Sequence, residues 1–183
     1  MVLDIIANAA EISNAISALA SDVARGVVLV HGSRGSAGSG VIWNSPGLVI
    51  TNHHVVPGPT AQVVLAGGRR YPARVVRRSP EHDLVALEVV AEPALLEAMA
   101  RVGDSQALRA GDLVLAVGNP MAERNAATLG IAAASGAADV LRLAIDLRPG
   151  NSGGGLANAR GQIVGIPHMV VGRGVAQGSF LGP

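Results

Sequence analysis

A serine surrounded by glycines has the clearest chemical potential in this chain. Ser152 lies in the stretch DLRPGNSGGGL, residues 146–156, with a glycine two positions before it and another directly after it. Glycines allow a sharp backbone turn and let a carbonyl group approach the amides without an intervening Cβ. The N–H groups of Gly150 and Ser152 would then converge on a developing oxyanion, which lowers the barrier to acyl transfer by about 3 kcal/mol. Taken alone, the stretch is also consistent with a flexible glycine/serine loop.

A serine hydroxyl is a weak nucleophile until a base removes its proton, so this chemistry also needs a histidine and an acid. The stretch TNHHVV, residues 51–56, offers His53 and His54, and residue type alone does not separate them. Asp83 opens the apolar run 83–90, where an unpaired acid on the way into a core would be costly. These segments supply a base, an acid and a nucleophile in the order His, Asp, Ser, which predicts a serine hydrolase.

A β framework is predicted to hold these residues in place. From Val27 onward, short runs rich in valine, isoleucine and leucine are separated by glycine, proline and asparagine about every ten residues, as is typical of an all-β sandwich or barrel. The polar, turn-rich segment 91–111 is predicted to link two six-stranded halves. The predicted strands lie at residues 27–31, 38–43, 47–52, 61–66, 70–78, 83–90, 113–117, 127–135, 139–145, 154–158, 161–166 and 174–178.

The N-terminal residues predict an amphipathic helix that ends near Gly26, because apolar residues recur every three or four positions over residues 2–23. This apolar stripe must be covered by the barrels, by another copy or by a partner. The segment has no basic start and is interrupted by polar residues, so it predicts neither a signal peptide nor a membrane span. As written, the chain is expected in the cytoplasm, or in the periplasm or outside the cell if a leader has been removed.

Composition narrows the function classes further. The chain has 183 residues, of which 49% are apolar, and its formal net charge is only +1. A core can therefore form, and binding of nucleic acid or a membrane surface through basic charge is not expected. The absence of cysteine excludes disulfides, thiolate zinc sites and cysteine nucleophiles. We expect no metal and no cofactor, and we interpret the Gly-rich run 31–40 as a hairpin loop because it lacks a P-loop ending.

Five segments resemble the Deg/HtrA group of trypsin-like serine proteases. GSGVIWNSPGLVITNHHVV is similar to that group's Gly-Ser-Gly…Thr-Asn-x-His-Val signature, and four later segments follow the group's order: HDLVALEV, VGDSQALRAGDLVLAVGNP, LGIAAASG and RPGNSGGGLANARGQIVGI. The resemblance covers residues 23–166. It implies two six-stranded antiparallel β-barrels of the chymotrypsin type, with a cleft between them and peptide bonds as substrate. We expect a helix at 1–25 and a protease domain at 26–183, with barrels at about 26–100 and 105–183.

The resemblance also assigns roles to the candidate residues. It implies that His54, directly before the valine, is the base, Asp83 the orienting acid and Ser152 the nucleophile. It likewise places the oxyanion hole at the N–H groups of Gly150 and Ser152. His53 takes the variable position of the signature, and neighbouring side chains point in different directions. We therefore expect His53 to be a partly exposed neighbour whose loss is tolerated.

The substrate pocket is predicted from the geometry of that family. It would be lined by the residues before the nucleophile and by the strand after Gly165, namely Asp146, Leu147, Arg148, His168 and Val170. A buried Asp146 would favour arginine or lysine in the substrate, whereas an Asp146 that faces solvent or pairs with Arg148 or Arg173 would not. A narrow entrance beside Val170 favours small aliphatic residues, which is the preference we expect.

His168 and Asn151 depart from familiar patterns. His168 stands where the family usually carries a threonine or serine that braces the catalytic aspartate, so either its imidazole takes over that bond or the register slips by one. Asn151 offers no charge to a newly cut N-terminus. This implies that activity is governed by loop order and not by zymogen cleavage.

Partners follow from the same resemblance. We expect polypeptide substrates, and a homo-oligomer through the N-terminal helix, a trimer as in the family, is one option. No PDZ module is present in the sequence, which indicates a stand-alone or truncated protease domain. The alternative function is a chaperone-like module that holds unfolded peptides by strand addition without cutting them.

Overall fold

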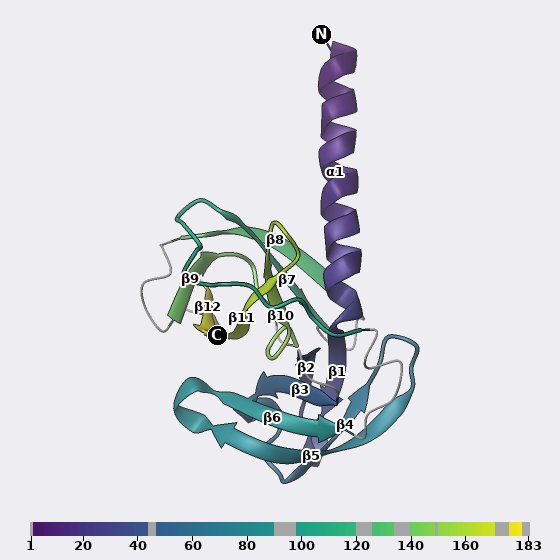
Figure 1. Cartoon of the computed structure of the whole chain (residues 1–183), viewed down its shortest axis with the longest axis vertical. Coiled ribbons are helices and arrows are strands. Elements are labelled where there is room, and N and C mark those ends of the chain that lie inside the picture. The colour runs from purple at the N-terminus through teal and green to yellow at the C-terminus, as the bar shows by residue number, and fades with distance from the viewer. Residues whose placement is uncertain are drawn as a thin grey trace.

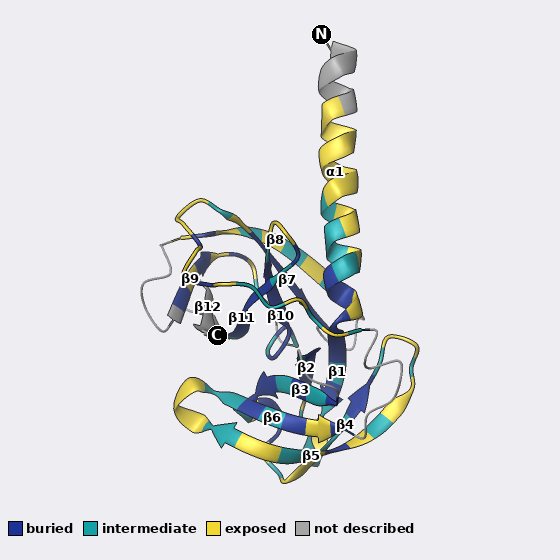
Figure 2. Ribbon diagram, in the orientation of Figure 1, coloured by how far each residue is buried: buried dark blue, intermediate teal, exposed yellow. Residues whose placement is uncertain are grey.

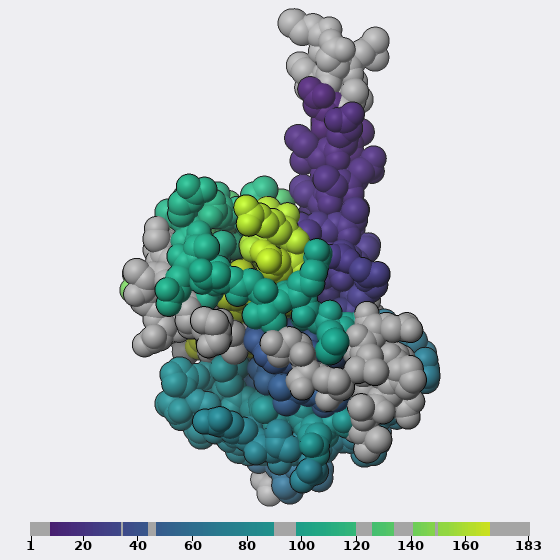
Figure 3. Space-filling view, in the orientation of Figure 1, coloured from purple at the N-terminus to yellow at the C-terminus, as the bar shows by residue number. Residues whose placement is uncertain are grey.

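The computed structural model describes residues 2–43, 47–89, 98–119, 126–133, 140–148, 150–170 and 176–180. Helix α1 (Val2–Arg25) comes first, and its N-terminal part stands clear of the rest of the chain (Figures 1 and 3). The strands that follow form two barrels below and beside the helix base. The predicted all-β class with an N-terminal helix is confirmed.

The first barrel contains the strands β1 (Val27–His31), β2 (Ala37–Ile42), β3 (Leu48–Asn52), β4 (Thr60–Val64), β5 (Arg70–Ser79) and β6 (Leu84–Val89). Their order around the barrel is β1-β2-β3-β6-β5-β4, and antiparallel pairing of β1 with β4 closes it. Val30, Val63 and Leu87 are fully buried in its core. The buried valines belong to the valine-, isoleucine- and leucine-rich runs from which these strands are predicted.

The second barrel contains the strands β7 (Leu113–Gly118), β8 (Ala126–Ala132), β9 (Val140–Ala144), β10 (Gly155–Asn158), β11 (Ile163–Val170) and β12 (Ala176–Phe180). Their order is β7-β8-β9-β12-β11-β10, closed by antiparallel pairing of β7 with β10. This is the strand order of the first barrel, so the two halves share one topology. Both predicted six-stranded barrels are therefore present.

The base of α1 joins the two barrels. Val23 and Ala24 are buried in a third apolar cluster that also takes residues from both barrels, among them Val41 and Leu115. Higher up, Figure 2 shows the helix as largely exposed, and Ile12 has 61% of its surface accessible. No helix among the described residues is long and apolar enough to cross a membrane.

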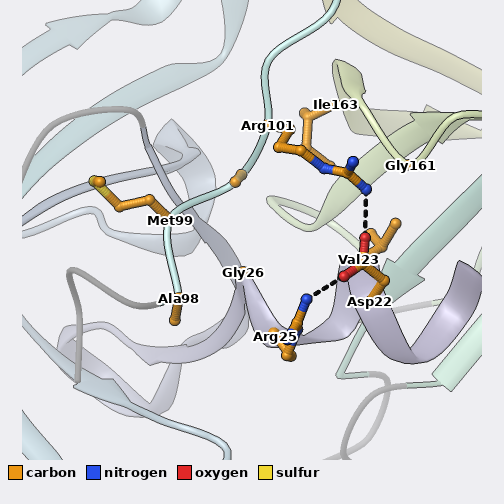
Figure 4. Close-up of a pocket in the computed structure, with 10 residues that line it drawn as sticks. Asp22, Val23, Arg25, Gly26, Ala98, Met99, Arg101, Gly161 and Ile163 are labelled. Carbon is orange, nitrogen blue, oxygen red and sulfur yellow. Dashed lines mark hydrogen bonds and ion pairs between the residues drawn. The ribbon is translucent and has the colours of Figure 1, made fainter.

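A hollow lies where α1 meets the linker that precedes the second barrel (Figure 4). Asp22 accepts hydrogen bonds there from Arg25 of its own helix and from Arg101 of the linker. These pairs hold the pKa of Asp22 below its usual value, mainly through the Arg25 hydrogen bond. None of the candidate catalytic residues lines this hollow.

All twelve predicted strands are present, and the Gly-rich run 31–40 contains the hairpin connection between the first two of them. Residues 32–36 connect β1 to β2, and residues 37–40 already belong to β2. Glycine is required within the strand as well, because Gly40 lies so close to Val30 and Val49 that an added Cβ would come within 2.8 Å of each side chain. Part of the predicted linker, residues 91–97, lies outside the described residues. The proposed domain boundaries stay a prediction.

Candidate active site

The end of β3 and the start of β6 bring the candidate histidine and aspartate together. Asn52 is paired with Leu84 across the two strands, and its Nδ2 donates to the carbonyl oxygen of Asp83 at 2.9 Å. The N–H of His53 donates to the same carbonyl at 3.0 Å. A single 3₁₀ turn, His53–Val55, then carries the second histidine. These bonds fix the backbone of Asp83 to the segment 52–55 that carries both histidines.

His54 and Asp83 form the predicted imidazole–carboxylate pair. The Nδ1 atom of His54 lies 2.7 Å from Oδ2 of Asp83, and the backbone N–H of His54 donates to Oδ1 at 3.1 Å. Because a carboxylate only accepts, the proton of the neutral ring lies on Nδ1 and Nε2 keeps a free lone pair. Nε2 is the atom that a general base needs, and 51% of the His54 side chain is accessible.

Asp83 has a left-handed backbone conformation, with φ 52° and ψ 42°, directly after the 3₁₀ turn Pro80–His82. It is the single non-glycine residue with positive φ in the described parts of the chain. This conformation costs a residue other than glycine about 1–2 kcal/mol, and aspartate is among the few that adopt it. The hydrogen bonds to its carbonyl oxygen and carboxylate offset that cost. Such strain is characteristic of functional sites.

Ser152 follows a tight turn at residues 148–151. The N–H of Asn151 donates to the carbonyl of Arg148 at 3.0 Å, and Gly150 has a φ of +100°. Positive φ at the third residue of such a hydrogen-bonded turn favours glycine. Gly153 has a φ of +81°, and a Cβ on it would lie 2.2 Å from the carbonyl oxygen of Ser39. The sharp turn predicted from the glycines is therefore present.

The turn that carries Ser152, residues 150–153 (the nucleophile turn), lies against the turn His53–Val55 and the residues that follow it to Gly58 (the histidine loop). A Cβ added to Gly38 would come within 3.0 Å of the Ser152 carbonyl oxygen and 2.7 Å of Val55, the last residue of the histidine turn. Gly38 therefore lies between the two segments, and there is no room for a side chain at this position. Among the described residues, no acceptor contacts the N–H groups of Gly150 or Ser152. Both donors are available to a substrate carbonyl.

His168 on β11 is the second imidazole of this site, and it is half-buried. Its burial lowers its pKa below the ordinary value because the cation is poorly solvated. The charge of Asp83 opposes this shift, and that of His54 adds to it. His168 therefore lies within electrostatic range of both members of the pair and favours its neutral form.

For the other predicted pocket residues, the structure gives no contact with His54, Asp83 or Ser152 among the described residues. Asp146 is exposed, and its Oδ2 lies 3.9 Å from Nε of Arg148. Leu147 is partly buried against the core of the second barrel. Val170 ends β11, but its side chain lies outside the description, as does Arg173. The substrate preference predicted from these residues stays a prediction.

Two residues of the site were not found from the sequence. Arg78 on β5 has NH1 2.9 Å from Nδ1 of His53, and it also donates to the carbonyls of Val56, at 2.6 Å, and Gly58. His53 is thus an acceptor that helps Arg78 to hold the histidine loop. Ser39 contacts the nucleophile turn from the opposite barrel. Ser39 belongs to the Gly-Ser-Gly motif of the first segment, but its contact could not be read from the motif, and no local signal marks Arg78, because the partners of both residues are distant in sequence.

The arrangement has the parts that acyl transfer by a serine requires. An imidazole with a fixed tautomer, its carboxylate partner, a serine after a tight turn and two amide N–H groups without an acceptor among the described residues lie at the junction of the barrels. No group of three His, Asp or Glu side chains suited to a metal ion occurs in the described part of the chain.

The sequence of this chain is similar to those of trypsin-like peptidases. A profile of the family described as trypsin-like peptidase domain matches residues 38–166. Serine protease Do-like HtrA of Lactobacillus helveticus is 38% identical over 149 residues, which are 73% of this chain and 36% of that protein. Periplasmic serine endoprotease DegP of Escherichia coli (strain K12) is 37% identical over 139 residues, 70% of this chain and 29% of DegP. The chain spans about a third of the length of these relatives.

Among solved structures, the chain is similar to the HtrA-type protease AlgW with decapeptide. The TM-score is 0.77 at 25% sequence identity, and the match covers 88% of this chain and 62% of that one. Because the match covers 88% of this chain, the similarity extends over both barrels.

Proposed function

This chain belongs to the trypsin-like peptidase family, and from this premise we propose that it is a serine endopeptidase of the Deg/HtrA kind. The observation that carries the proposal is the double contact between His54 and Asp83, 2.7 Å at the ring and 3.1 Å at the backbone. This contact fixes the imidazole with Nε2 unprotonated, as a general base requires. A binding module would not need it.

In the proposed mechanism, Nε2 of His54 takes the proton of Ser152 Oγ as that oxygen attacks the peptide carbonyl carbon. The carbonyl oxygen becomes an oxyanion held by the N–H groups of Gly150 and Ser152. Protonated His54 then gives its proton to the leaving amine, and the peptide C–N bond breaks. Water, activated by the same ring, hydrolyses the acyl-enzyme. Asp83 stabilises the imidazolium at each stage.

We further propose that the substrates are extended segments of unfolded or damaged polypeptides. The decapeptide named with AlgW supports a peptide ligand for this fold. The exposure of Asp146 and its pairing with Arg148 support small aliphatic residues, and not basic ones, before the cut bond. A cleavage profile dominated by arginine and lysine would overturn that preference.

Helix α1 is proposed to contact another copy of this chain. Ala9, Ile12 and Ile16 continue the apolar stripe of the helix above the point where Val23 is buried, and Ile12 is exposed. Such a stripe is typical of helices that pack on other helices. The names of the DegP relatives support a periplasmic location, since they are called periplasmic endoproteases.

The decisive test is Ser152→Ala. We expect it to abolish cleavage of casein and labelling by a fluorophosphonate while the thermal midpoint is kept. Ser105→Ala, a buried serine in a different loop, is the matched control and should leave both unchanged. Undiminished cleavage by pure Ser152→Ala would overturn the proposal. Wild-type protein that binds unfolded peptide without cutting or labelling would favour the chaperone-like alternative.

A further inference from the structure

Ser39, on β2 of the first barrel, contacts the nucleophile turn of the second barrel at two points. Its Oγ lies 2.7 Å from the carbonyl oxygen of Gly150, which is 111 positions away in the sequence. Its backbone N–H donates to the carbonyl oxygen of Ser152 at 2.9 Å. Ser39 is fully buried, so water does not compete for these bonds.

The direction of the hydroxyl bond is unambiguous. The backbone N–H of Asn119, at the end of β7, donates to Ser39 Oγ at 2.7 Å. An N–H can only donate, so the hydroxyl proton of Ser39 goes to Gly150. Asn119 also donates from Nδ2 to the carbonyl of Val28 in the first barrel at 3.1 Å. Ser39 is thus one member of a bonded junction between the barrels.

Glycines bring the two backbones close enough for this junction. A Cβ on Gly118 would lie 2.9 Å from Cα of Asn151 and 3.1 Å from Ser39 Oγ. The corresponding Cβ on Gly153 would lie 2.2 Å from the Ser39 carbonyl oxygen. Neither side of the junction has room to shift while these contacts are kept.

The residues anchored by Ser39 are the two that supply the oxyanion donors. Gly150 is conformationally free by residue type, so its orientation must be set by its partners. Ser39 holds the carbonyls of Gly150 and Ser152, whereas their N–H groups contact no acceptor among the described residues. We propose that Ser39 is a positioning residue that fixes the oxyanion hole from the opposite barrel. This inference rests on the proposed protease function.

The physical reason is preorganisation. Donors that already point to the developing charge do not have to reorganise during the reaction. Ser39→Ala removes the hydroxyl, so the Gly150 carbonyl and the Asn119 N–H each lose a partner in a buried place. The nucleophile turn then samples orientations in which its amides miss the oxyanion. Binding of an uncleaved peptide does not depend on those amides to the same degree.

The test compares wild type, Ser39→Ala and Ser39→Cys, with Ser105→Ala as the buried-serine control. We expect kcat of Ser39→Ala for a peptide substrate to fall on the order of tenfold with KM unchanged, less than the roughly 10²–10³-fold cost of losing a whole oxyanion donor. The affinity for a peptide boronate, whose tetrahedral adduct places an oxygen in the hole, should fall by the same factor as kcat/KM. Ser39→Cys, with its weaker donor, should lie in between.

A purely structural role has a different result. It would lower the thermal midpoint while kcat and boronate affinity of the folded fraction stay at wild-type values, and that outcome would overturn the proposal. If Ser39→Ala does not fold, Ser39→Cys decides the question by the same readouts. Wild-type protein without activity would instead reject the protease function itself, so the two failures are distinguishable.

Discussion

Asp83 binds His54 through both of its carboxylate oxygens, one at the imidazole Nδ1 and one at the backbone N–H of the same residue. The two contacts fix the position of the main chain and the rotation of the ring together. The left-handed backbone of Asp83 aims its carboxylate in this direction, and Asn52 and His53 hold its carbonyl from the other side. The geometry of the base is therefore determined largely by one aspartate.

Asp83→Asn should separate this orienting role from folding. The amide oxygen can still accept the backbone N–H of His54, but the amide nitrogen donates to Nδ1 and places the ring proton on Nε2. We expect kcat to fall by about 10⁴ with little change in the thermal midpoint. Asp104→Asn, at an exposed aspartate whose Oδ1 accepts the Gln106 N–H, is the control and should leave kcat unchanged. Near-normal activity of Asp83→Asn would contradict the assigned tautomer.

The adjacent histidines should differ sharply on substitution. His54→Ala should abolish fluorophosphonate labelling, because Ser152 loses its base. His53→Ala should keep labelling and lose about 1 kcal/mol of stability, since Arg78 loses one acceptor and keeps the carbonyls of Val56 and Gly58. Loss of labelling in His53→Ala but not in His54→Ala would show that the wrong ring carries the base.

The role of His54 could be predicted from the sequence, whereas the contact of His53 with Arg78 could not. Short runs rich in valine, isoleucine and leucine, separated by turn residues, predict the strands because these runs fill the barrel cores, and local motifs point to His54, Asp83 and Ser152. The partners of Ser39 and Arg78 could not be predicted, because their contacts join segments 20 to 111 positions apart. The need for glycine at position 40 could not be predicted either, since the Val30 and Val49 side chains that leave no room for a Cβ there belong to other strands.

His168→Thr should change the acid sensitivity of the protein. Burial holds the pKa of His168 below its ordinary value of 6.5, so the unfolded chain takes up its proton first as the pH falls. Above 6.5 the residue adds no pH dependence. Below 6.5 the free energy of unfolding decreases until the pH passes the lowered folded pKa.

Threonine removes this contribution, so urea midpoints of His168→Thr should fall less than those of wild type between pH 7 and pH 5. Activity should show the same difference, because a protonated His168 competes with His54 for the charge of Asp83. Parallel pH profiles for wild type and His168→Thr would contradict the role of burial.

Asp22→Asn should loosen the base of α1 without affecting catalysis. Asp22 accepts hydrogen bonds from Arg25 and Arg101, and the first of these is the main cause of its lowered pKa. A carboxylate with a lowered folded pKa stabilises the fold above its unfolded value, here 3.8, and loses that contribution as the pH falls through the folded pKa. All three side chains are partly or largely exposed, so we expect a loss of up to about 1 kcal/mol at pH 7. The difference between wild type and Asp22→Asn in urea unfolding should therefore shrink below pH 3.8 and vanish once the pH is below the lowered folded pKa, with kcat unchanged at pH 7. A difference that persists at the lowest pH would show that the carboxylate charge is not what holds the helix.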